Sequence, residues 1–275
     1  MPTYLDAILA AHRAQAAADG RDVTELVARA EQAGPGRDFT RALLHPPGAG
    51  PGHLAVIAEV KRRSPSKGPL APDLDPAEVA RQYQRGGAAC LSVLTDTDFF
   101  GGSATDLDRA RRACALPVLR KDFTVAPADV CDARLMGADA VLLIVAALSD
   151  RELGELLQLA RRLQLAALVE VHDESEAERA LAAGAELVGV NQRDLLSFAV
   201  DTARAERVAG CLPESVVAVA ESGVGGPGDA RRLAEAGYQA VLVGETLVRA
   251  ADRSAAVAGL AGHAVGRRRP APVGP

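Results

Sequence analysis

GADAVLLI, at residues 137–144, is one version of a phrase that occurs four times along this 275-residue chain. In each copy, a stretch with helical spacing of apolar residues ends at a glycine, a common residue just past a helix end. A short apolar run follows, which is typical of a strand buried on both faces of a parallel sheet. The repetition predicts a fold of repeated helix–strand units. The other copies are GAACLSVL at 87–94, GAELVGV at 184–190 and GYQAVLVG at 237–244.

Further apolar runs complete a set of eight predicted strands separated by helices. We expect strands at 54–61, 90–95, 116–121, 140–146, 166–171, 186–191, 216–221 and 240–244. We expect helices between them, among others at 76–85, 127–136, 150–163, 174–183 and 227–236. Eight such units are typical of an α/β protein with a (β/α)8 fold, the TIM barrel. A doubly wound open sheet is the alternative, but it usually has a G-x-G-x-x-G turn after its first strand, and EVKRR from Glu59 has no such glycines.

The chain divides into three parts around this barrel. Residues 1–50 hold two predicted helices, at 4–17 and 23–31, and end in a Gly/Pro-rich link. We expect them to form an N-terminal helical extension that packs on the barrel. Residues 51–266 form the predicted catalytic barrel, and residues 267–275, RRRPAPVGP, a disordered tail. We interpret the arginine triplet of this tail as a solvated chain end.

Composition and charge exclude several classes of protein. Hydrophobic residues make up 48% of the chain and charged residues 24%, which excludes a disordered, a collagen-like and a coiled-coil chain. The longest apolar run falls short of the about 20 residues that a membrane-spanning helix needs. The N-terminus has an acid at Asp6 and does not match a secretory signal. The net charge of −5 argues against nucleic acid as a partner.

The cysteines and histidines form neither a metal-binding nor a disulfide pattern. The four cysteines are dispersed without a C-x-x-C pair, so we expect buried thiols in a reducing compartment, the cytoplasm. The five histidines are dispersed as well, and the chain has no H-E-x-x-H motif. We therefore expect no metal site.

Charged and amide side chains stand at the carboxyl ends of five of the eight predicted strands. In a barrel of this kind, those ends surround the active site. Acids and lysines that pack closely shift each other's pKa values, so that both can act near neutral pH. The pattern therefore predicts a general acid–base site. The residues are Glu59 and Lys61, which point to one face because they are two apart, then Lys121, Glu170, Asn191, Arg193, Glu221 and Ser222.

Glycine-rich turns follow the last two predicted strands, where barrels often bind phosphate. The turn SGVGGPG begins with Ser222 and Gly223, and Gly244 and Glu245 directly follow the last strand. Glycine lets backbone N–H groups approach phosphate oxygens closely. Ser64, in the segment SPSKG after the first strand, offers a further donor or belongs to a plain surface turn. We predict a phosphate-binding site at these turns.

Phrases at these positions, taken in order, resemble the indole-3-glycerol phosphate synthase family. The resemblance runs from about residue 56 to residue 249, and the first fifty residues match only loosely. Each phrase alone is short, but their order is highly specific. The phrases are IAEVKRRSPSKG from Ile57, LSVLTD from Leu91, FFGGS from Phe99, PVLRKDF from Pro117, LVEVH from Leu168, GVNQRDL from Gly189, AESGV from Ala220 and VLVGETLVR from Val241.

The resemblance implies an enzyme of tryptophan biosynthesis. It would convert 1-(2-carboxyphenylamino)-1-deoxyribulose 5-phosphate to indole-3-glycerol phosphate, carbon dioxide and water, with no metal and no redox cofactor. It implies that Lys121 is the acid that protonates the ketone oxygen, with Lys61 as a second cation near the substrate carboxylate and an alternative acid. Glu170 matches the family's base. Glu59 and Asn191 would hold the lysines and the substrate.

The resemblance also implies the binding residues for the two ends of the substrate. The anthranilate ring would lie in an apolar slot that includes Phe99 and Leu142. A family member can carry serine at the position of Glu245, whose carboxylate would repel a phosphate unless it turns away. The phosphate-binding residues would be Ser64, Ser222, Gly223, Gly244 and Glu245, with Lys67 as a further candidate.

Arg193 has two interpretations of equal weight. It orients Asn191 or the substrate, or it forms a structural ion pair with Glu221 or Asp194. We expect the protein to be a monomer or a weak homo-oligomer, with a small phosphorylated molecule as its partner and no membrane contact.

Two other functions stay open from the sequence. A phosphoribosyl isomerase on a related barrel would have a catalytic Cys/Asp or paired aspartates near the first and fifth strands, where this chain has Glu59, Lys61 and Glu170. A scaffold without enzymatic activity would have no reason to keep converging lysines and glutamates, although a fold alone never implies a function.

Overall fold

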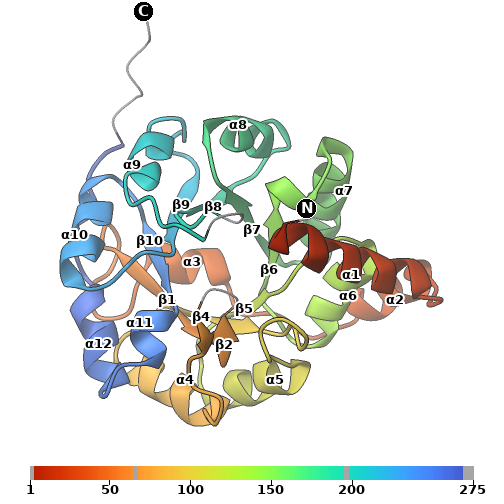
Figure 1. Cartoon of the computed structure of the whole chain (residues 1–275), viewed down its shortest axis with the longest axis horizontal. Helices are drawn as coiled ribbons and strands as arrows, with labels where there is room; N and C mark the ends of the chain where they lie inside the picture. Colours follow the sequence, from red (N-terminus) through yellow and green to blue (C-terminus); the bar gives the residue numbers. More distant parts are fainter. Residues whose placement is uncertain (1–2, 65–66, 195–197, 269–275) are drawn as a thin grey trace, which may run out of the picture.

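The eight predicted strands are present and close into a parallel barrel, which confirms the (β/α)8 prediction (Figure 1). The computed structural model describes residues 3–64, 67–194 and 198–268. Each strand pairs in parallel with its neighbours in chain order, and the last pairs with the first. The barrel strands are β1 (Ala55–Val60), β4 (Cys90–Leu94), β5 (Val118–Lys121), β6 (Ala140–Ile144), β7 (Ala166–Val171), β8 (Leu187–Asn191), β9 (Val217–Glu221) and β10 (Ala240–Val243).

Helices lie between the strands and surround the ring in Figure 1. Their starts have local causes: Asp75 and Ser149 cap α4 and α7 through their side chains, and prolines open α4 and α6. These helices are α4 (Pro76–Arg85), α5 (Ala104–Ala113), α6 (Pro127–Leu135), α7 (Asp150–Arg162), α8 (Glu174–Ala182), α9 (Arg204–Ala209), α10 (Pro227–Glu235), α11 (Glu245–Val248) and α12 (Arg253–Leu260). A 3-10 turn, η1 (Val145–Ala147), follows β6, and a small hairpin of β2 (Arg63–Ser64) and β3 (Gly68–Pro69) follows β1.

The glycine of each repeated phrase ends its helix as predicted. Gly87 has a φ of 87°, its N–H donates to the Gln84 carbonyl, and the N–H of Ala88 reaches back to the Tyr83 carbonyl. This pair of bonds satisfies the last carbonyls of a helix, and glycine adopts the required conformation without a Cβ clash. The same φ region is found at Gly137 (85°), Gly184 (86°) and Gly237 (91°). The phrase therefore encodes the end of a helix and the start of the next buried strand.

The N-terminal extension contains three helices rather than the two predicted. α1 (Tyr4–Ala18) and α2 (Val23–Glu31) match the predicted positions, and α3 (Phe39–Leu44) is additional. α3 is short, is capped by Asp38 and buries Phe39 and Leu43, so it depends on tertiary packing more than on helical periodicity. It packs against β1 and β4 and crosses the middle of the ring in Figure 1.

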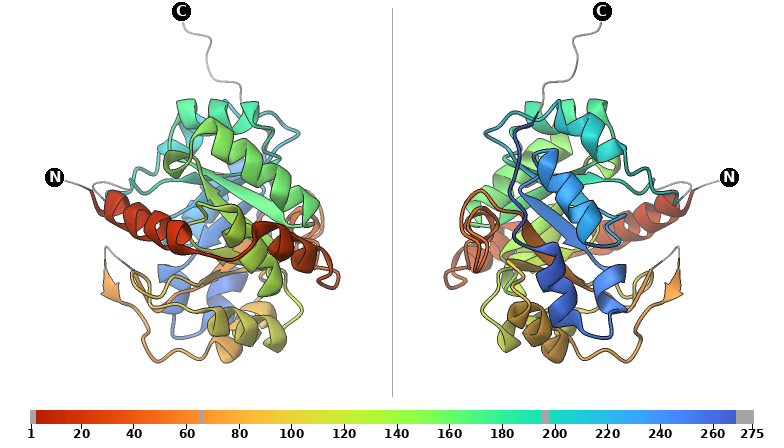
Figure 2. Two further views of the ribbon diagram at one scale, coloured as in Figure 1. Left: turned by 90° about the vertical axis from the view of Figure 1, so that its right-hand side faces the viewer. Right: turned by 90° about the vertical axis from the view of Figure 1, so that its left-hand side faces the viewer.

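The first helix lies at the carboxyl ends of the strands. Figure 2 shows the start of α1 and the β2–β3 hairpin on the same face of the barrel. His12 on α1 bonds to Asp96, which follows β4, and Arg13 donates to the carbonyl of Ala147, which follows β6. α2 then packs against α6. The extension thus reaches from the mouth of the barrel along its outer helices. No helix in the described part of the chain is both long and apolar enough to cross a membrane.

Arg268 corrects the prediction of a solvated arginine triplet at the start of the tail. Its side chain is buried against the barrel, with 9% of the residue exposed. The guanidinium donates to the carbonyls of Pro213 (3.0 Å) and Val216 (2.5 Å) and to the Gln239 side chain (3.2 Å). These acceptors are remote from Arg268 in the sequence, so local composition could not reveal them. Residues 269–275 lie outside the described part of the chain.

Candidate active site

The carboxyl ends of the strands enclose a cavity of about 470 Å³. It contains the groups that were predicted to converge, together with apolar side chains and the two glycine turns. Of the residues predicted for the site, those that line the cavity are Glu59, Lys61, Ser64, Lys121, Leu142, Glu170, Asn191, Arg193, Glu221, Ser222, Gly223, Gly244 and Glu245.

Lys121 lies at the centre of the charged groups and bridges two buried carboxylates. Its Nζ donates to Glu170 Oε2 at 2.6 Å and to Glu221 Oε2 at 3.0 Å. Each of the three is the last or nearly the last residue of its strand, on β5, β7 and β9. Both carboxylates are only 2% exposed, so little solvent screens the interaction.

The two carboxylates that contact Lys121 have pKa values shifted in opposite directions. Burial alone would raise the pKa of Glu170, but the charges of Lys121 and His172 hold it well below its usual range. Burial raises the pKa of Glu221 to about 7, because the negative charge of Glu170 offsets much of the help from Lys121. Burial would lower the pKa of Lys121, but the surrounding carboxylates raise it. The site thus brings together three groups with different protonation behaviour. Glu170 stays a carboxylate, Glu221 titrates near neutral pH, and Lys121 stays an ammonium.

Glu221 has a larger part in this site than the sequence suggested. Its Oε1 is buried without a hydrogen-bond partner, although its Oε2 bonds to Lys121. The carboxylate fits because Gly189 on β8 has no side chain; a Cβ there would come within 3.0 Å of Oε1. The sequence placed Glu221 at a strand end and offered Arg193 as its partner, whereas the structure pairs it with Lys121.

Glu59 and Lys61 form a second ion pair at the end of β1. Glu59 is 3% exposed, and the Ser92 hydroxyl lies 3.5 Å from its other oxygen. Gly244 leaves room for this pair, since a Cβ there would come within 3.0 Å of both the carboxylate and the ammonium. The ion pair fixes Lys61 at the cavity wall.

Asn191 connects the strand end of β8 to Glu170. Its Nδ2 donates to Glu170 Oε1 at 3.1 Å, and its Oδ1 accepts from the backbone N–H of Arg193 at 3.0 Å. The Arg193 guanidinium donates to the carbonyl of Phe198 at 3.0 Å. The backbone N–H of Arg193 thus holds the Asn191 side chain, a bond that any residue at position 193 could make, and the two interpretations of the Arg193 side chain stay predictions.

The turn after β9 lines the cavity and has an unusual backbone conformation. Ser222 and Gly223 both have positive φ, 64° and 73°. A serine rarely adopts this conformation, and here the buried Gln192 amide fixes it by donating to the Ser222 carbonyl at 2.7 Å. Consecutive residues of this kind form concavities that bind anions.

Glu245 begins α11 beside this turn, and its carboxylate has a cation for a partner. Arg249, one helical turn along, lies 3.9 Å from it and also lines the cavity. The Thr246 hydroxyl donates to the Val224 carbonyl and ties α11 to the turn after β9. Arg249 therefore adds positive charge where the carboxylate of Glu245 alone would repel a phosphate. Arg249 was not predicted from the sequence, although it lies one helical turn beyond the predicted phosphate-binding residue Glu245.

Ser64, on β2 of the hairpin that follows β1, also lines the cavity. Its Oγ accepts the N–H of Lys67 at 3.2 Å. Lys67 itself is exposed and is not among the lining residues. Residues 65–66 lie outside the described part of the chain.

The apolar wall of the cavity differs from the prediction in one residue. Leu142 lines it as predicted, but Phe100 and Phe123 take the place of Phe99. The Phe99 ring instead meets Tyr4 of α1 edge to face, with the ring centroids 5.9 Å apart. One oxygen of Asp96 accepts the N–H groups of both Phe99 and Phe100 and so fixes the backbone that carries the two rings.

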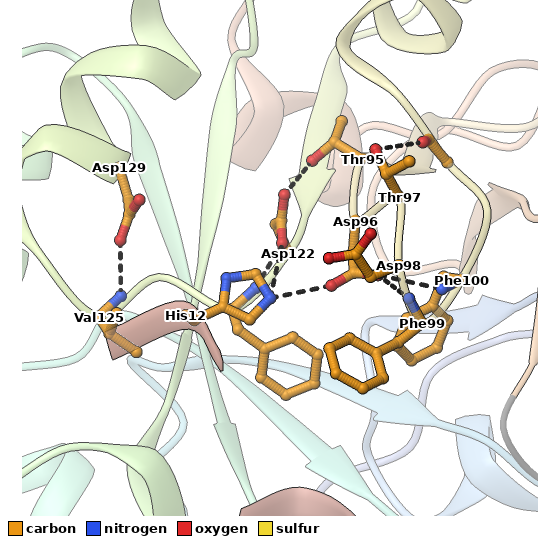
Figure 3. A network of polar contacts seen from close by, with 12 residues as sticks. His12, Thr95, Asp96, Thr97, Asp98, Phe99, Phe100, Asp122, Val125 and Asp129 are labelled. Atoms are coloured by element: carbon orange, nitrogen blue, oxygen red, sulfur yellow. Dashed lines mark hydrogen bonds and ion pairs between the residues drawn. The ribbon is translucent and has the colours of Figure 1, made fainter. Parts of the chain in front are cut away.

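A cluster of His12, Asp96 and Asp122 joins α1 to this wall (Figure 3). The imidazole Nε2 lies 2.9 Å from Asp96 and 3.9 Å from Asp122. Three such groups could offer ligand atoms to a metal ion. Their oxygens are already engaged: Asp96 caps the turn of Phe99 and Phe100, and Asp122 accepts from Thr95, Arg120 and the Phe123 N–H. The cluster is therefore best explained as the attachment of α1 to the mouth of the barrel.

The cavity combines three parts that suit one kind of reaction. The ammonium and carboxylate groups can move protons, the apolar wall can hold an aromatic ring, and the turns after β9 and β10 can hold an anion. An elongated substrate with an aromatic ring at one end and a phosphate at the other would span these parts, with its middle at Lys121.

Comparisons with known proteins agree with this geometry. The family model described as "Indole-3-glycerol phosphate synthase" matches residues 5–260. "Indole-3-glycerol phosphate synthase 2" of Streptomyces coelicolor is 55% identical over 209 residues, 76% of this chain and 81% of that protein. "Indole-3-glycerol phosphate synthase" of a Nocardioides species is 56% identical over 208 residues, 76% of this chain and 80% of that protein.

Solved structures of other barrel enzymes share the fold at low sequence identity. A thiamine phosphate pyrophosphorylase from Pyrococcus furiosus superposes with a TM-score of 0.58 at 18% identity, over 75% of this chain and 93% of that one. A 3-hexulose-6-phosphate synthase gives a TM-score of 0.58 at 17% identity, over 75% of this chain and 98% of that one. These two likenesses show the fold alone.

Proposed function

The chain belongs to the indole-3-glycerol phosphate synthase family, and we propose that Lys121 and Glu170 are the acid and the base of its reaction. The enzyme is a carboxy-lyase of tryptophan biosynthesis. It closes the indole ring of 1-(2-carboxyphenylamino)-1-deoxyribulose 5-phosphate and releases carbon dioxide and water. The bridge from Lys121 to Glu170 and Glu221, inside a cavity with an anion-binding turn, is the observation that carries the assignment.

Ring closure needs an acid at the ketone oxygen. The ring carbon that bears the carboxylate attacks the ketone carbon, and negative charge develops on the ketone oxygen. In this proposal Lys121 gives that oxygen a proton, which is supported by its position in the cavity lining and by the raised pKa that keeps it charged. An alkoxide is a stronger base than an amine, so the transfer is favourable even from this ammonium.

Decarboxylation and dehydration then restore aromaticity. Loss of carbon dioxide leaves a hydroxyl on the carbon that was the ketone. A base takes a proton from the neighbouring CH₂ carbon while the hydroxyl leaves as water with a proton from an acid. Glu170 is the base in this proposal because its low pKa keeps it ionised and its Oε2 faces Lys121 in the cavity.

The remaining residues hold the substrate in this proposal. Lys61, fixed by Glu59, faces the substrate carboxylate until it leaves as carbon dioxide, and Asn191 fixes Glu170. The apolar wall takes the ring. The phosphate lies on the N–H groups of Ser222, Gly223, Gly244 and Glu245, with Ser64 and Arg249 beside it. Folding the flexible substrate so that ring and ketone meet is itself a large contribution to catalysis.

Two variants test the assignment of acid and base. Lys121→Ala and Glu170→Gln should each lower kcat by about 10²–10⁴-fold, measured by the indole fluorescence of the product, while the substrate still binds in a calorimetric titration. Arg151→Ala, at an exposed arginine of α7, is the control and should keep kcat within twofold. Near-normal turnover in both active-site variants would refute the assignment.

We also propose the setting in which the enzyme works. Its four cysteines are all free thiols, which supports the cytoplasm as its compartment.

Exposed large hydrophobic residues are dispersed over several elements, which supports a monomer or a weak homo-oligomer. These residues are Tyr4, Val23, Leu44, Leu135 and Val200. Light scattering behind a sizing column tests the oligomeric state. Domain boundaries at residues 50 and 266 stay a prediction, tested by limited proteolysis.

A further inference from the structure

His172 stands directly behind Glu170, outside the residues that line the cavity. It follows β7 two residues after Glu170, so the two side chains lie on the same side of the chain. Its side chain is 11% exposed, and its Nε2 lies 3.5 Å from Glu170 Oε1. That nitrogen is buried without a hydrogen-bond partner. A buried polar atom left unpaired costs free energy unless the site uses it, so the position of Nε2 needs a reason.

Glu176 holds the imidazole in this orientation from the other side. One oxygen of Glu176 accepts both the backbone N–H of His172 at 2.8 Å and its ring Nδ1 at 3.0 Å. Glu176 is itself fixed in the first turn of α8, where its N–H donates to the capping residue Asp173. The ring therefore cannot turn without breaking these bonds, and its Nε2 stays aimed at Glu170.

The charges around His172 favour its protonated form. Burial alone would lower the pKa of His172, but Glu170 and Glu176 raise it to about 9. Glu170 is on its own strand and Glu176 on α8, and Lys121 lies beyond Glu170. η1, which packs against both β7 and α8, is Val-Ala-Ala and brings no charge. The side chain is thus an imidazolium between two carboxylates at neutral pH.

The two oxygens of Glu170 have different partners. Oε1 faces Asn191 at 3.1 Å and His172 at 3.5 Å, whereas Oε2 faces Lys121 at 2.6 Å. When Lys121 donates to the ketone oxygen of the substrate, Oε2 loses its donor, whereas Oε1 keeps the hydrogen bond from Asn191 and the nearby charge of His172. The carboxylate then stays ionised and in place with one oxygen free.

We propose that His172 is a positioning residue for the reaction: held by Glu176, its imidazolium fixes Oε1 of Glu170, so that Oε2 takes the proton from the substrate. The proton moves from the CH₂ carbon to Oε2, and the electron pair of that bond forms the indole double bond as water leaves. The inference rests on the proposed role of Glu170 as base.

The pH profile of kcat tests this role with a pair of matched variants. His172→Asn keeps a donor near Glu176 and removes Nε2 and its charge, whereas His172→Gln places a neutral amide near Nε2. An opposite charge at this distance shifts a carboxylate pKa by about one to three units. His172→Asn should therefore move the acid limb of the kcat profile up by about one unit or more and remove any limb near pH 9, with KM changed less than twofold. His172→Gln should show a smaller shift.

Two controls separate this role from a structural one. His45→Asn, at an exposed histidine, should leave the profile unchanged. Glu176→Gln loosens His172 without touching Glu170 and should shift the acid limb in the same direction. In the unmodified enzyme, the ring of His172 should titrate well above pH 6.5 in a ¹⁵N NMR experiment, which needs no variant.

The outcomes distinguish this inference from the proposed function. A His172→Asn profile that overlays the His45→Asn profile overturns the inference, and so does a His172 ring that titrates at or below pH 6.5. Should Glu170→Gln be inactive in either case, the role of Glu170 stands and only that of His172 falls. Normal turnover by Glu170→Gln would overturn both the proposed role of Glu170 and the inferred role of His172.

Discussion

Replacing Gly189 with alanine should displace Glu221 and thereby weaken the hold on Lys121. Gly189 faces the barrel interior from β8, and an added Cβ would come within 3.0 Å of Glu221 Oε1 and 3.2 Å from a methyl of Leu168. The carboxylate is the end of a side chain and can turn aside. The free energy of unfolding should therefore fall by only about 1 kcal/mol, the lower end for overpacking, which lowers Tm by about 2–4 °C.

The loss of activity should exceed the loss of stability in this variant. Turning the carboxylate breaks its 3.0 Å bond to Lys121. A hydrogen bond between charged groups contributes about 1.5–3 kcal/mol, so kcat/KM should fall about ten- to hundredfold. The assays are indole fluorescence for turnover and urea unfolding for stability.

Gly154→Ala is the matched control for this prediction. Gly154 lies within α7 with nothing inside 4 Å of an added Cβ. Alanine there should raise the free energy of unfolding by about 0.5–1 kcal/mol, because glycine is the poorer helix former, and should leave turnover unchanged. A Gly189→Ala enzyme whose kcat/KM lies within twofold of the Gly154→Ala enzyme would refute the reasoning.

Three further variants test other parts of the structure. The pKa of Glu221 is raised from 4.5 to about 7, so the folded state holds this proton more tightly; its contribution to stability is complete below about pH 4.5 and is lost as the pH rises through about 7. Glu221→Gln should flatten that part of the pH dependence of the urea midpoint, and an unchanged slope would contradict the shift. Arg249→Ala should raise KM about tenfold, one lost ion pair with the phosphate, at unchanged kcat; steady-state kinetics measure this, and a changed kcat with constant KM would place Arg249 elsewhere in the reaction. Arg268→Ala should lower the free energy of unfolding by about 2–4 kcal/mol, because it leaves buried carbonyls unpaired; Arg267→Ala, at an exposed position, is the control in urea unfolding and should show almost no loss.

The parts of the fold that the sequence predicted are those encoded within a few residues. Gly137 ends a helix, and the buried strand β6 follows directly. The glycine that ends the helix and the apolar residues that form the strand therefore stand in the same short phrase. Arg268 is the contrary case, since its acceptors at Pro213 and Val216 come from a distant loop. Nothing near Arg268 in the sequence distinguishes it from a solvated arginine.

The apolar wall of the cavity is a second case in which neighbouring residues in the sequence do not predict a side chain's position. Phe99 and Phe100 are adjacent in the irregular segment after β4, where neither period 2 nor period 3.6 assigns a face. Asp96 fixes the backbone of this segment by accepting both N–H groups, and Tyr4 of α1 packs against the Phe99 ring. Asp96 is in turn held by His12, which lies on a helix more than eighty residues earlier in the chain.

The role of Glu221 could have been predicted by counting strands. In these barrels, four side chains from alternate strands form one layer, and Glu59, Lys121, Glu170 and Glu221 stand on β1, β5, β7 and β9, the alternate strands of this barrel. The layer holds three carboxylates and one ammonium, and Lys61 adds a second ammonium at its edge. Three negative and two positive charges buried together leave one carboxylate without a counter-charge, so one of the three must bind a proton more readily than an exposed acid does. Glu221 is that carboxylate, because Glu59 has Lys61 beside it and Glu170 has the closer contact with Lys121. The same count explains why Glu170 stays ionised and free to act as a base, while the acid next to it carries the proton near neutral pH.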